Sequence, residues 1–137
     1  MAAFILDISA FLPNPPVGND DMERILGMVG KTPSRTRRVI LRTNGIQTRH
    51  YAIDPVTLEL THNNTELTVA AIKGLRFPEG MSIRDVDCLC CGTSTPDQLM
   101  PGHGVMVHGE AGIPPCEVIT TSGICLSGIA ALKYAYM

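Results

Sequence analysis

The sequence has very few aromatic side chains, with no tryptophan, three phenylalanines and three tyrosines among 137 residues. Its hydrophobic content of 45% therefore comes mostly from aliphatic side chains, methionine and cysteine. Side chains of this kind suit buried strands that are covered by helices. A chain of this length is expected to form one domain, and it can bury a core without help from disulfides or metal ions.

The sequence also lacks a long apolar run and a basic segment at its N-terminus. No stretch reaches the roughly 18 apolar residues that a membrane span needs, and the opening MAAFILDISAFLP has no positive n-region of a signal peptide. We therefore expect a cytoplasmic protein that does not bind membranes. The five cysteines form an odd set, so free thiols are expected, either in the core or as a nucleophile.

Acidic residues are missing from one segment. Residues 24–53 hold seven basic side chains and no aspartate or glutamate, whereas the rest of the chain holds four basic and thirteen acidic residues. Such a segment is typical of a surface that binds phosphate groups, or of a solvated basic face. Because only Tyr51 could stack on a base in this segment, we do not expect nucleic-acid binding.

Helical and strand-like patterns alternate along the chain. Strands are predicted at 4–11, 46–53, 86–91 and 118–120, and helices at 19–29, 33–43, 63–73, 101–109 and 126–137. The helix at 63–73 begins with a capping-box sequence and is stopped by Gly74, and Asn19 is the expected N-cap of the first helix. The alternation predicts an α/β fold with a mostly parallel sheet.

A metal site built from the cysteines and histidines of the second half is not expected. The C-x-C-C spacing of Cys88, Cys90 and Cys91 is not the usual C-x-x-C ligand spacing, and a strand turns Cys88 and Cys90 to one face and Cys91 to the other. His103 and His108 are about 140° apart around a helix, so they do not share a face. We therefore expect no metal, and these thiols are interpreted as core residues.

Cys125 is the candidate nucleophile, because it stands where a strand is expected to turn into the last helix. The positive end of a helix and its free amides favour a thiolate and can stabilise an oxyanion. We expect Gly123 and Gly128 to let the backbone turn sharply and to allow close approach. A buried core cysteine remains the alternative on spacing alone. The glycine-rich stretch 102–104 lacks the Lys-Ser/Thr ending of a phosphate loop.

Three segments carry a resemblance to a known family. RTNGIQTRH at 42–50, DCLCCGTSTPDQLMP at 87–101 and VITTSGICLSGIAAL at 118–132 occur in the order and rough spacing of ketoacyl-ACP synthase III enzymes. The chain resembles the N-terminal part of this thiolase-fold family over nearly its whole length. The resemblance implies that residues 1–137 are one incomplete thiolase-like domain, a partial N-terminal half with a mostly parallel sheet and a buried nucleophile helix.

The resemblance also implies roles for individual residues. Cys125 would take an acyl group from a CoA or carrier-protein thioester, and Met100 would bound the partner's acyl pocket across a homodimer. Arg35, Arg38 and Arg42 lie near the position where the family binds the CoA nucleotide or the carrier, and they share one face of the helix predicted at 33–43. No tightly bound cofactor is implied, because acyl-CoA or acyl-carrier protein and malonyl-carrier protein are the substrates.

The implied reaction is a decarboxylative Claisen condensation that gives a 3-oxoacyl thioester in fatty acid or polyketide biosynthesis. Val39 stands where some relatives have an adenine-stacking tryptophan, which favours a carrier-borne primer. The C-x-x-G that follows the nucleophile is closer to chalcone synthases and hydroxymethylglutaryl-CoA synthases. Acyl carrier protein is therefore the expected partner.

The resemblance places the family's catalytic histidine and asparagine in a C-terminal half that lies outside residues 1–137. We therefore expect the chain to be a fragment or one of two chains, completed by that half in cis or in trans. Without it, the last helix should expose a set of apolar side chains, namely Ile124, Leu126, Ile129 and Leu132. Two other readings remain open, a catalytically silent subunit of a heteromeric synthase and a generic α/β binding protein.

Overall fold

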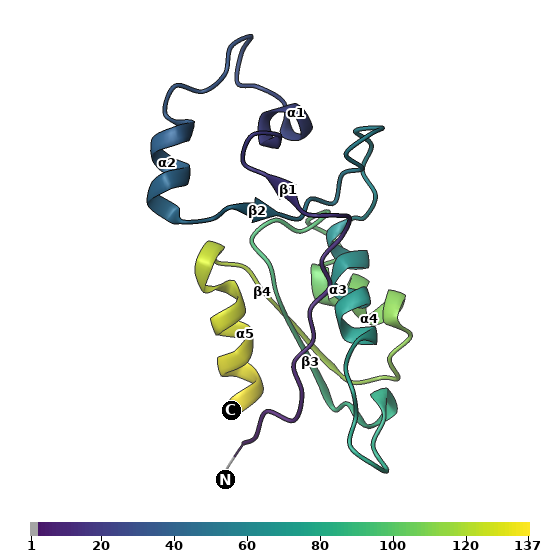
Figure 1. The fold of residues 1–137 in the computed structure, drawn as a ribbon. Coiled ribbons are helices and arrows are strands. Elements are labelled where there is room, and N and C mark those ends of the chain that lie inside the picture. Colours follow the sequence, from purple (N-terminus) through teal and green to yellow (C-terminus); the bar gives the residue numbers. More distant parts are fainter. Residues whose placement is uncertain (1–2) are drawn as a thin grey trace. The chain divides into compact units, whose positions relative to one another are not determined.

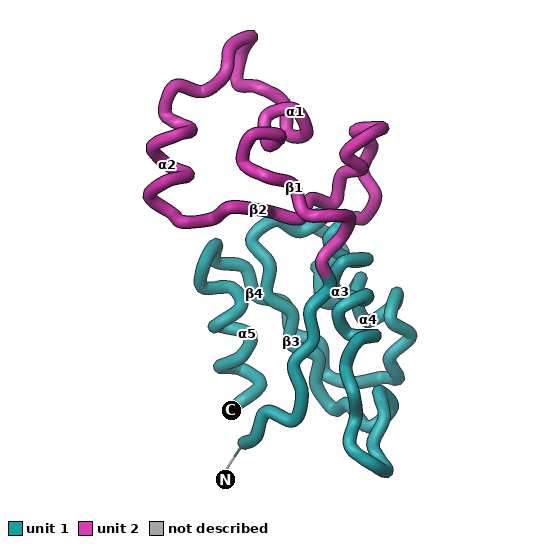
Figure 2. The backbone as a smooth tube through the Cα atoms, viewed as in Figure 1, with its two compact units in different colours: residues 1–11, 63–137 teal, residues 12–62 magenta. Residues whose placement is uncertain are grey.

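The computed structural model describes residues 3–137, which form two compact units (Figure 2). The first unit contains the described residues up to Phe11 together with residues 63–137, and the second contains residues 12–62. The assignment of one thiolase-like domain to residues 1–137 stays a prediction. Each unit has its own small sheet and its own helices.

A two-stranded parallel sheet lies at the centre of the first unit. β3 (Cys88–Gly92) pairs with β4 (Glu117–Thr121), so that Cys88 lies opposite Glu117 and Gly92 lies opposite Thr121. Both predicted strands and the parallel pairing are confirmed. The short apolar sequence of β3 suits a strand that has helices on both faces.

Three helices cover this sheet, as Figure 1 shows. α3 (Asn64–Lys73) and α4 (His103–Ala111) pack against each other, and α4 contacts both strands. α5 (Ser127–Tyr136) packs against β3 and β4 from the other side. The predicted helices at 63–73, 101–109 and 126–137 are thereby confirmed within a few residues at their ends.

The core of the first unit lies between the sheet and the α3–α4 pair. Val107 is fully buried and packs with Val69 of α3 and Cys91 of β3, and Leu89 joins them from the strand. Burial raises the pKa of the Cys91 thiol to about 11. Cys91 is therefore a core residue, as expected. The same expectation is wrong for Cys88 and Cys90, which lie on the opposite face of the strand and are only partly buried.

The start of α3 is stabilised by two separate groups of hydrogen bonds. Asn63 and Glu66 form the predicted capping box, in which each side chain accepts a hydrogen bond from the other residue's backbone. The carboxylate of Asp97 accepts hydrogen bonds from the amides of Asn64 and Thr65, at 2.7 and 2.9 Å. A carboxylate at this end of a helix is stabilising because the free amides and the helix dipole point toward it.

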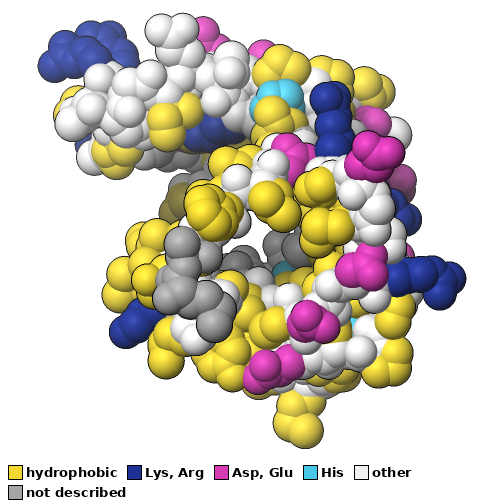
Figure 3. All heavy atoms as spheres, turned by 90° about the horizontal axis from the view of Figure 1, so that it is seen from below, with side chains coloured by type: hydrophobic (Ala, Val, Ile, Leu, Met, Phe, Trp, Pro, Cys, Tyr) yellow, Lys and Arg dark blue, Asp and Glu magenta, His cyan; other side chains and the backbone are white. Residues whose placement is uncertain are grey.

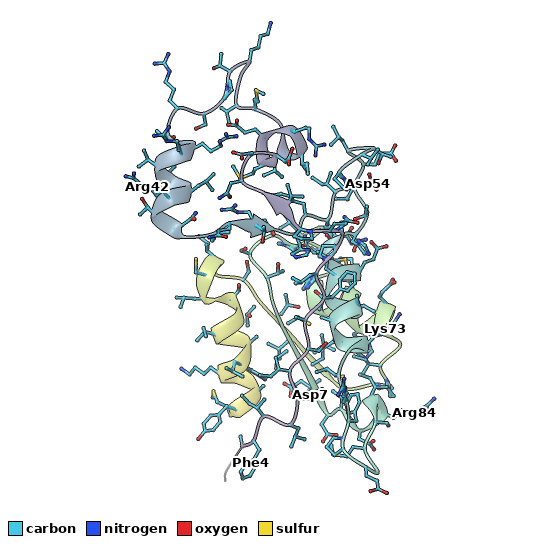
Figure 4. All side chains as sticks on the ribbon, viewed as in Figure 1. Phe4, Asp7, Arg42, Asp54, Lys73 and Arg84 are labelled. Atoms are coloured by element: carbon cyan, nitrogen blue, oxygen red, sulfur yellow. The ribbon has the colours of Figure 1, made fainter. Side chains whose placement is uncertain are left out.

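The prediction of a buried strand at 4–11 is wrong. The structure shows no strand there, and Phe4, Ile5 and Ile8 are exposed. Instead, the carboxylate of Asp7, labelled in Figure 4, accepts a hydrogen bond of 2.7 Å from the amide of Arg76. An apolar run becomes a buried strand only when a neighbouring strand takes up its backbone hydrogen bonds, and no strand among residues 3–137 pairs with it.

The second unit contains a short antiparallel pair, β1 (Val17–Gly18) with β2 (Thr48–Arg49), and the helices α1 (Met22–Leu26) and α2 (Arg37–Asn44). The strand predicted at 46–53 is thus confirmed only at Thr48–Arg49. The side-chain amide of Asn14 donates to the carbonyls of Tyr51 and Ile53, at 2.8 and 3.2 Å. This side chain occupies carbonyls that a partner strand would otherwise bind.

Both helices of the second unit are shorter than predicted. Asn19 does not cap α1, because its side chain donates to the carbonyl of Ile46 and accepts from Arg49, and α1 begins after Asp21 instead. α2 begins at Arg37 rather than at residue 33, but it ends at Asn44, within one residue of the predicted end, and Gly45 after it adopts the left-handed conformation. Arg35 consequently lies before the helix.

The helices that residues 3–137 form are all too short or too polar to cross a membrane.

The Asp97 cap leads to a prediction about stability and pH. Burial acts to raise the pKa of Asp97, but the hydrogen bonds from Asn64 and Thr65 outweigh it and hold the pKa below its usual value. The contribution of Asp97 is therefore present above about pH 4 and is lost as the pH falls through the lower folded-state pKa. We expect Asp97→Asn to lower the free energy of unfolding by about 1 kcal/mol at pH 7.

The measurement is urea denaturation at several pH values, with Asp87→Asn as the control for an exposed aspartate. The difference between Asp97→Asn and the unmodified chain should shrink as the pH falls below about 4. A difference that stays constant with pH, or one no larger than that of Asp87→Asn, would contradict the cap.

Candidate functional site

The carboxyl ends of β3 and β4 bring two functional loops to one edge of the sheet. Because the strands are parallel, the loop that holds Met100 and the turn that holds Cys125 both begin at this edge. The amide of Thr93 donates to the carbonyl of Thr121 at 3.2 Å, just where the strands end. In α/β folds, ligands bind at the carboxyl ends of parallel strands.

The turn between β4 and α5 contains a strained residue. Cys125 lies in a single turn of 3₁₀ helix (Ile124–Leu126), in which the amide of Leu126 donates to the carbonyl of Gly123. Ile124 has φ of 50°, a conformation that is rare for a β-branched side chain. Strain of this kind persists only where the surrounding structure holds it, and it is frequent at functional sites.

The expectation that Gly123 and Gly128 allow the sharp turn is wrong. Gly123 has φ of 177°, which is extended backbone that any residue can adopt. A Cβ atom at Gly128 would meet nothing within 4 Å among residues 3–137, so no close approach within this part of the chain depends on that glycine. The change of direction is made at Ile124 instead, and no sequence pattern indicated it.

Two hydroxyl groups hold the first turn of α5 in place. The Thr121 hydroxyl donates to the carbonyl of Ser127, and the Ser127 hydroxyl donates to the carbonyl of Ile124, both at 2.7 Å. On β3, a Cβ atom at Gly92 would collide with the backbone of Ser127, so the strand and the helix are in direct contact. Threonine and serine beside a helix start are the signal that could have identified these positioning residues.

Cys125 has an exposed thiol, unlike the buried Cys91. A sulfur at the start of a helix lies near amides that have no partner inside the helix and near the positive end of the helix dipole. The alternative of a buried core cysteine at this position is therefore not observed. The arrangement can present a nucleophile to a thioester and can offer hydrogen-bond donors to an oxyanion.

Met100 lies in the loop between β3 and α4, next to Pro101, and its side chain is 85% exposed. The structure places Met100 and Cys125 in the first unit and Arg35, Arg38 and Arg42 in the second. The role of Met100 at a dimer interface stays a prediction.

A basic pocket of about 470 Å³ lies in the second unit, beside α2. It is lined by Asn19, Asp20, Arg37, Arg38, Leu41, Arg42, Gly45, Ile46 and Gln47. Arg38 and Arg42 therefore line the pocket as a helical i, i+4 pair, and Arg42 projects from α2 in Figure 4. Arg35 precedes the helix and is not part of the lining, so the predicted three-arginine face is wrong in that residue.

Arg37 is a pocket residue that the sequence did not single out. Its guanidinium forms an ion pair of 2.9 Å with Glu23, which also accepts a hydrogen bond from the amide of Ser34. Glu23 thus fixes the start of α2 and neutralises Arg37. Within residues 3–137 no ion pair is found for Arg38 or Arg42, which leaves their charges available to a ligand.

The candidate metal ligands are not gathered in one place. Residues 3–137 contain no group of three or more His, Cys, Asp or Glu side chains placed to hold a metal ion. His103 is buried, its Nε2 lies 3.2 Å from the Thr68 hydroxyl, and burial lowers its pKa against the opposing charge of Asp97. His108 Nε2 lies 3.0 Å from the carbonyl of Pro114.

Known proteins are similar in sequence to the chain over most of its length. No protein-family model matches the chain. It is 26% identical over 133 residues to a β-ketoacyl-[acyl-carrier-protein] synthase III of Hyphomonas neptunium, and 27% identical over 134 residues to that of Campylobacter fetus. Each match covers 97% of this chain and 37% of the relative.

A solved structure of a tetronic acid condensing enzyme superposes with a TM-score of 0.70 at 29% identity. That match covers 94% of this chain and 38% of the other, so the chain spans little more than a third of the proteins it matches. Over almost its whole length the chain is similar to an N-terminal part of a ketoacyl synthase III-like protein. Its fold is the corresponding part of a thiolase-like α/β fold.

The strain at Ile124 leads to a prediction with a matched control. Ile124 and Ile129 are both exposed, at 76% and 61%, so glycine at either position removes little buried area. Ile124→Gly should leave the free energy of unfolding unchanged or raise it by up to about 1 kcal/mol, because relief of strain offsets the added freedom of the unfolded chain. Ile129→Gly should lower it by about 1 kcal/mol, as in a helix interior.

Denaturant unfolding of the two variants provides the comparison. Equal losses of stability in Ile124→Gly and Ile129→Gly would show that the turn is not strained at Ile124.

Proposed function

We propose that the chain is the nucleophile-bearing part of a ketoacyl synthase III-type acyltransferase and that Cys125 is the nucleophile. The observation that carries the proposal is the exposed Cys125 thiol in a strand-to-helix turn, at the carboxyl edge of a parallel sheet. The similarity to ketoacyl synthases III supports the class of reaction. Catalysis of this kind is covalent, with an acyl-cysteine as the intermediate.

The first half-reaction is acyl transfer to the protein. The Cys125 thiolate attacks the carbonyl carbon of the primer thioester, the new carbon–sulfur bond forms, and the CoA or carrier thiol leaves with a proton. Amides at the start of α5 stabilise the oxyanion. In the second half-reaction a malonyl thioester loses CO₂, and its enolate attacks the acyl-cysteine to give a 3-oxoacyl thioester.

The second half-reaction needs hydrogen-bond donors to the malonyl carbonyl, and no residue among 1–137 matches the positions from which the family supplies them. The family uses a histidine and an asparagine from a C-terminal half, and we propose that this half, in cis or in trans, completes the site. Met100 would then bound the acyl pocket of the other subunit in a homodimer. Among the four histidines of the chain, His103 is buried in the core and does not take the place of the missing one.

The exposed apolar side of α5 supports the need for a second half. Ile124, Leu126, Ile129 and Leu132 are all exposed, as expected for an uncovered helix. Figure 3 shows hydrophobic side chains spread over one face of the molecule. Of the four, Ile129 and Leu132 line a groove of about 480 Å³, and the other lining residues are Ala3, Phe4, Ile5, Lys133, Ala135 and Tyr136. Because the matched relatives are almost three times as long as the match, we propose their remaining part as the occupant.

The pocket beside α2 supports a role in binding the acyl donor. Arg38 and Arg42 present two cations on one helix face, which suits the phosphates of CoA or of a carrier's phosphopantetheine arm. Val39 is exposed between them along the chain and offers no aromatic ring to adenine. A carrier-protein donor is therefore favoured over free acyl-CoA, in fatty acid or polyketide biosynthesis.

Incubation with acyl thioesters tests the nucleophile. We expect an acyl group on the Cys125 peptide after incubation of the protein with acyl-carrier protein or acyl-CoA, read by peptide mass spectrometry. Cys125→Ser should lose the modification, whereas Cys116→Ser should keep it, because Cys116 precedes β4 at the other end of the strand. A complete protein that stays unmodified with all primers would support the alternative, a catalytically silent subunit.

Substitution of the pocket arginines tests the donor site. Arg38→Ala and Arg42→Ala should each lower the kcat/KM of acyl transfer by about tenfold, since each removes a charge-assisted contact with phosphate. Arg35→Ala is the matched control, because Arg35 lies outside the pocket, and it should change kcat/KM by less than about twofold. Equal effects of all three variants would mean that only the general positive charge of the segment matters.

A further inference from the structure

Two cysteines that the proposed reaction does not use lie next to each other on β3. The sulfurs of Cys88 and Cys90 are 3.4 Å apart, and both side chains are partly buried. They share the face of the strand opposite Cys91, and this is the face on which α5 packs. Because residues i and i+2 of a strand point the same way, the strand itself holds the two thiols together.

One of the two thiols opens into a pocket. Cys88 lines a cavity of about 320 Å³ together with Glu117, Tyr134, Ala135 and Met137. The Tyr134 hydroxyl donates a hydrogen bond of 2.7 Å to Glu117, which lies opposite Cys88 in the strand register. The cavity gives a reagent access to Cys88, whose sulfur is within 3.4 Å of the Cys90 sulfur.

The geometry disfavours a disulfide between the two sulfurs. Alternate residues of a strand have Cα atoms roughly 6.6 to 6.8 Å apart. Disulfides have Cα atoms about 4.4 to 6.8 Å apart, and most often about 5.5 to 6 Å. The strand spacing lies at the upper limit of the disulfide range, so a direct bond of the common geometry would require the strand to contract where β3 is paired with β4. A single atom that bonds both sulfurs can span the gap without such a contraction.

The Cys88 thiol is protected from simple alkylation. Burial and the hydrogen bond with Cys90 raise the pKa of Cys88 to about 11. The thiolate is the form that attacks alkylating reagents, so Cys88 should react slowly with them. A reagent that removes both thiol protons as it binds does not depend on a pre-formed thiolate.

We propose that Cys88 and Cys90 form a dithiol site, separate from Cys125, that binds trivalent arsenic through both sulfurs. With an organoarsenic oxide, two arsenic–sulfur bonds form, the arsenic–oxygen bond breaks, and the oxygen leaves with both thiol protons as water. Arsenic remains trivalent, so the step needs no oxidant or reductant. Sulfur ligands of this kind are the ones that soft, thiophilic centres prefer.

The test is titration of the full chain with phenylarsine oxide, followed by iodoacetamide and peptide mass spectrometry. One phenylarsenic group per chain should bind, and it should protect Cys88 and Cys90 together from slow alkylation. Excess glutathione should leave it bound, whereas dithiothreitol should remove it. Cys88→Ser and Cys90→Ser should each weaken binding about 100-fold, because the second bond is intramolecular. Cys116→Ser, which removes another partly buried thiol, should bind as the unmodified chain does.

Circular dichroism shows whether each serine variant is folded. If a serine variant is unfolded, the alanine variant at the same position, Cys88→Ala or Cys90→Ala, is used instead. The proposal would be overturned if phenylarsine oxide failed to protect the two cysteines. It would also be overturned if a folded Cys90 variant bound phenylarsine oxide as tightly as the unmodified chain does. Cys125→Ser should still bind phenylarsine oxide, although it should lose the proposed acyl transfer. The two proposals can therefore fail independently.

Discussion

The parallel pairing of β3 with β4 is the constraint on which the rest of the first unit depends. Its register places Gly92 opposite Thr121, so both strands end at the same level. The loop with Met100 and the turn with Cys125 therefore start from one edge, where ligands bind in α/β folds. The same pairing holds Cys91 against α3 and α4 and turns Cys88 and Cys90 toward α5.

The fold separates thiols of different chemistry over a short distance in sequence. Cys91 is enclosed by aliphatic side chains and is kept neutral, as its raised pKa indicates. Cys125 is carried into solvent at the start of a helix by the strained Ile124 and by the hydroxyl contacts of Ser127. Position relative to the sheet, rather than the residue type alone, therefore distinguishes a core cysteine from a candidate nucleophile.

Elements that depend on local interactions could be predicted from the sequence, and elements that depend on distant partners could not. The capping box at Asn63 and the left-handed Gly45 mark helix ends through contacts within a few residues, so α3 and the end of α2 were predictable. The apolar run at 4–11 lacks a strand partner, and Asn19 bonds to residues about thirty positions away. The strain at Ile124 and the Arg37–Glu23 ion pair likewise depend on tertiary contacts that no local pattern encodes.

The central claim is that Cys125 is the residue that receives an acyl group. A protection experiment tests it most directly, by comparing the alkylation of Cys125 and Cys116 by iodoacetamide before and after incubation with an acyl-carrier protein. We expect Cys125 to react faster than Cys116 in the free protein and prior incubation to block Cys125 alone. Equal reactivity of the two thiols, with no protection of Cys125 by any acyl donor, would contradict it.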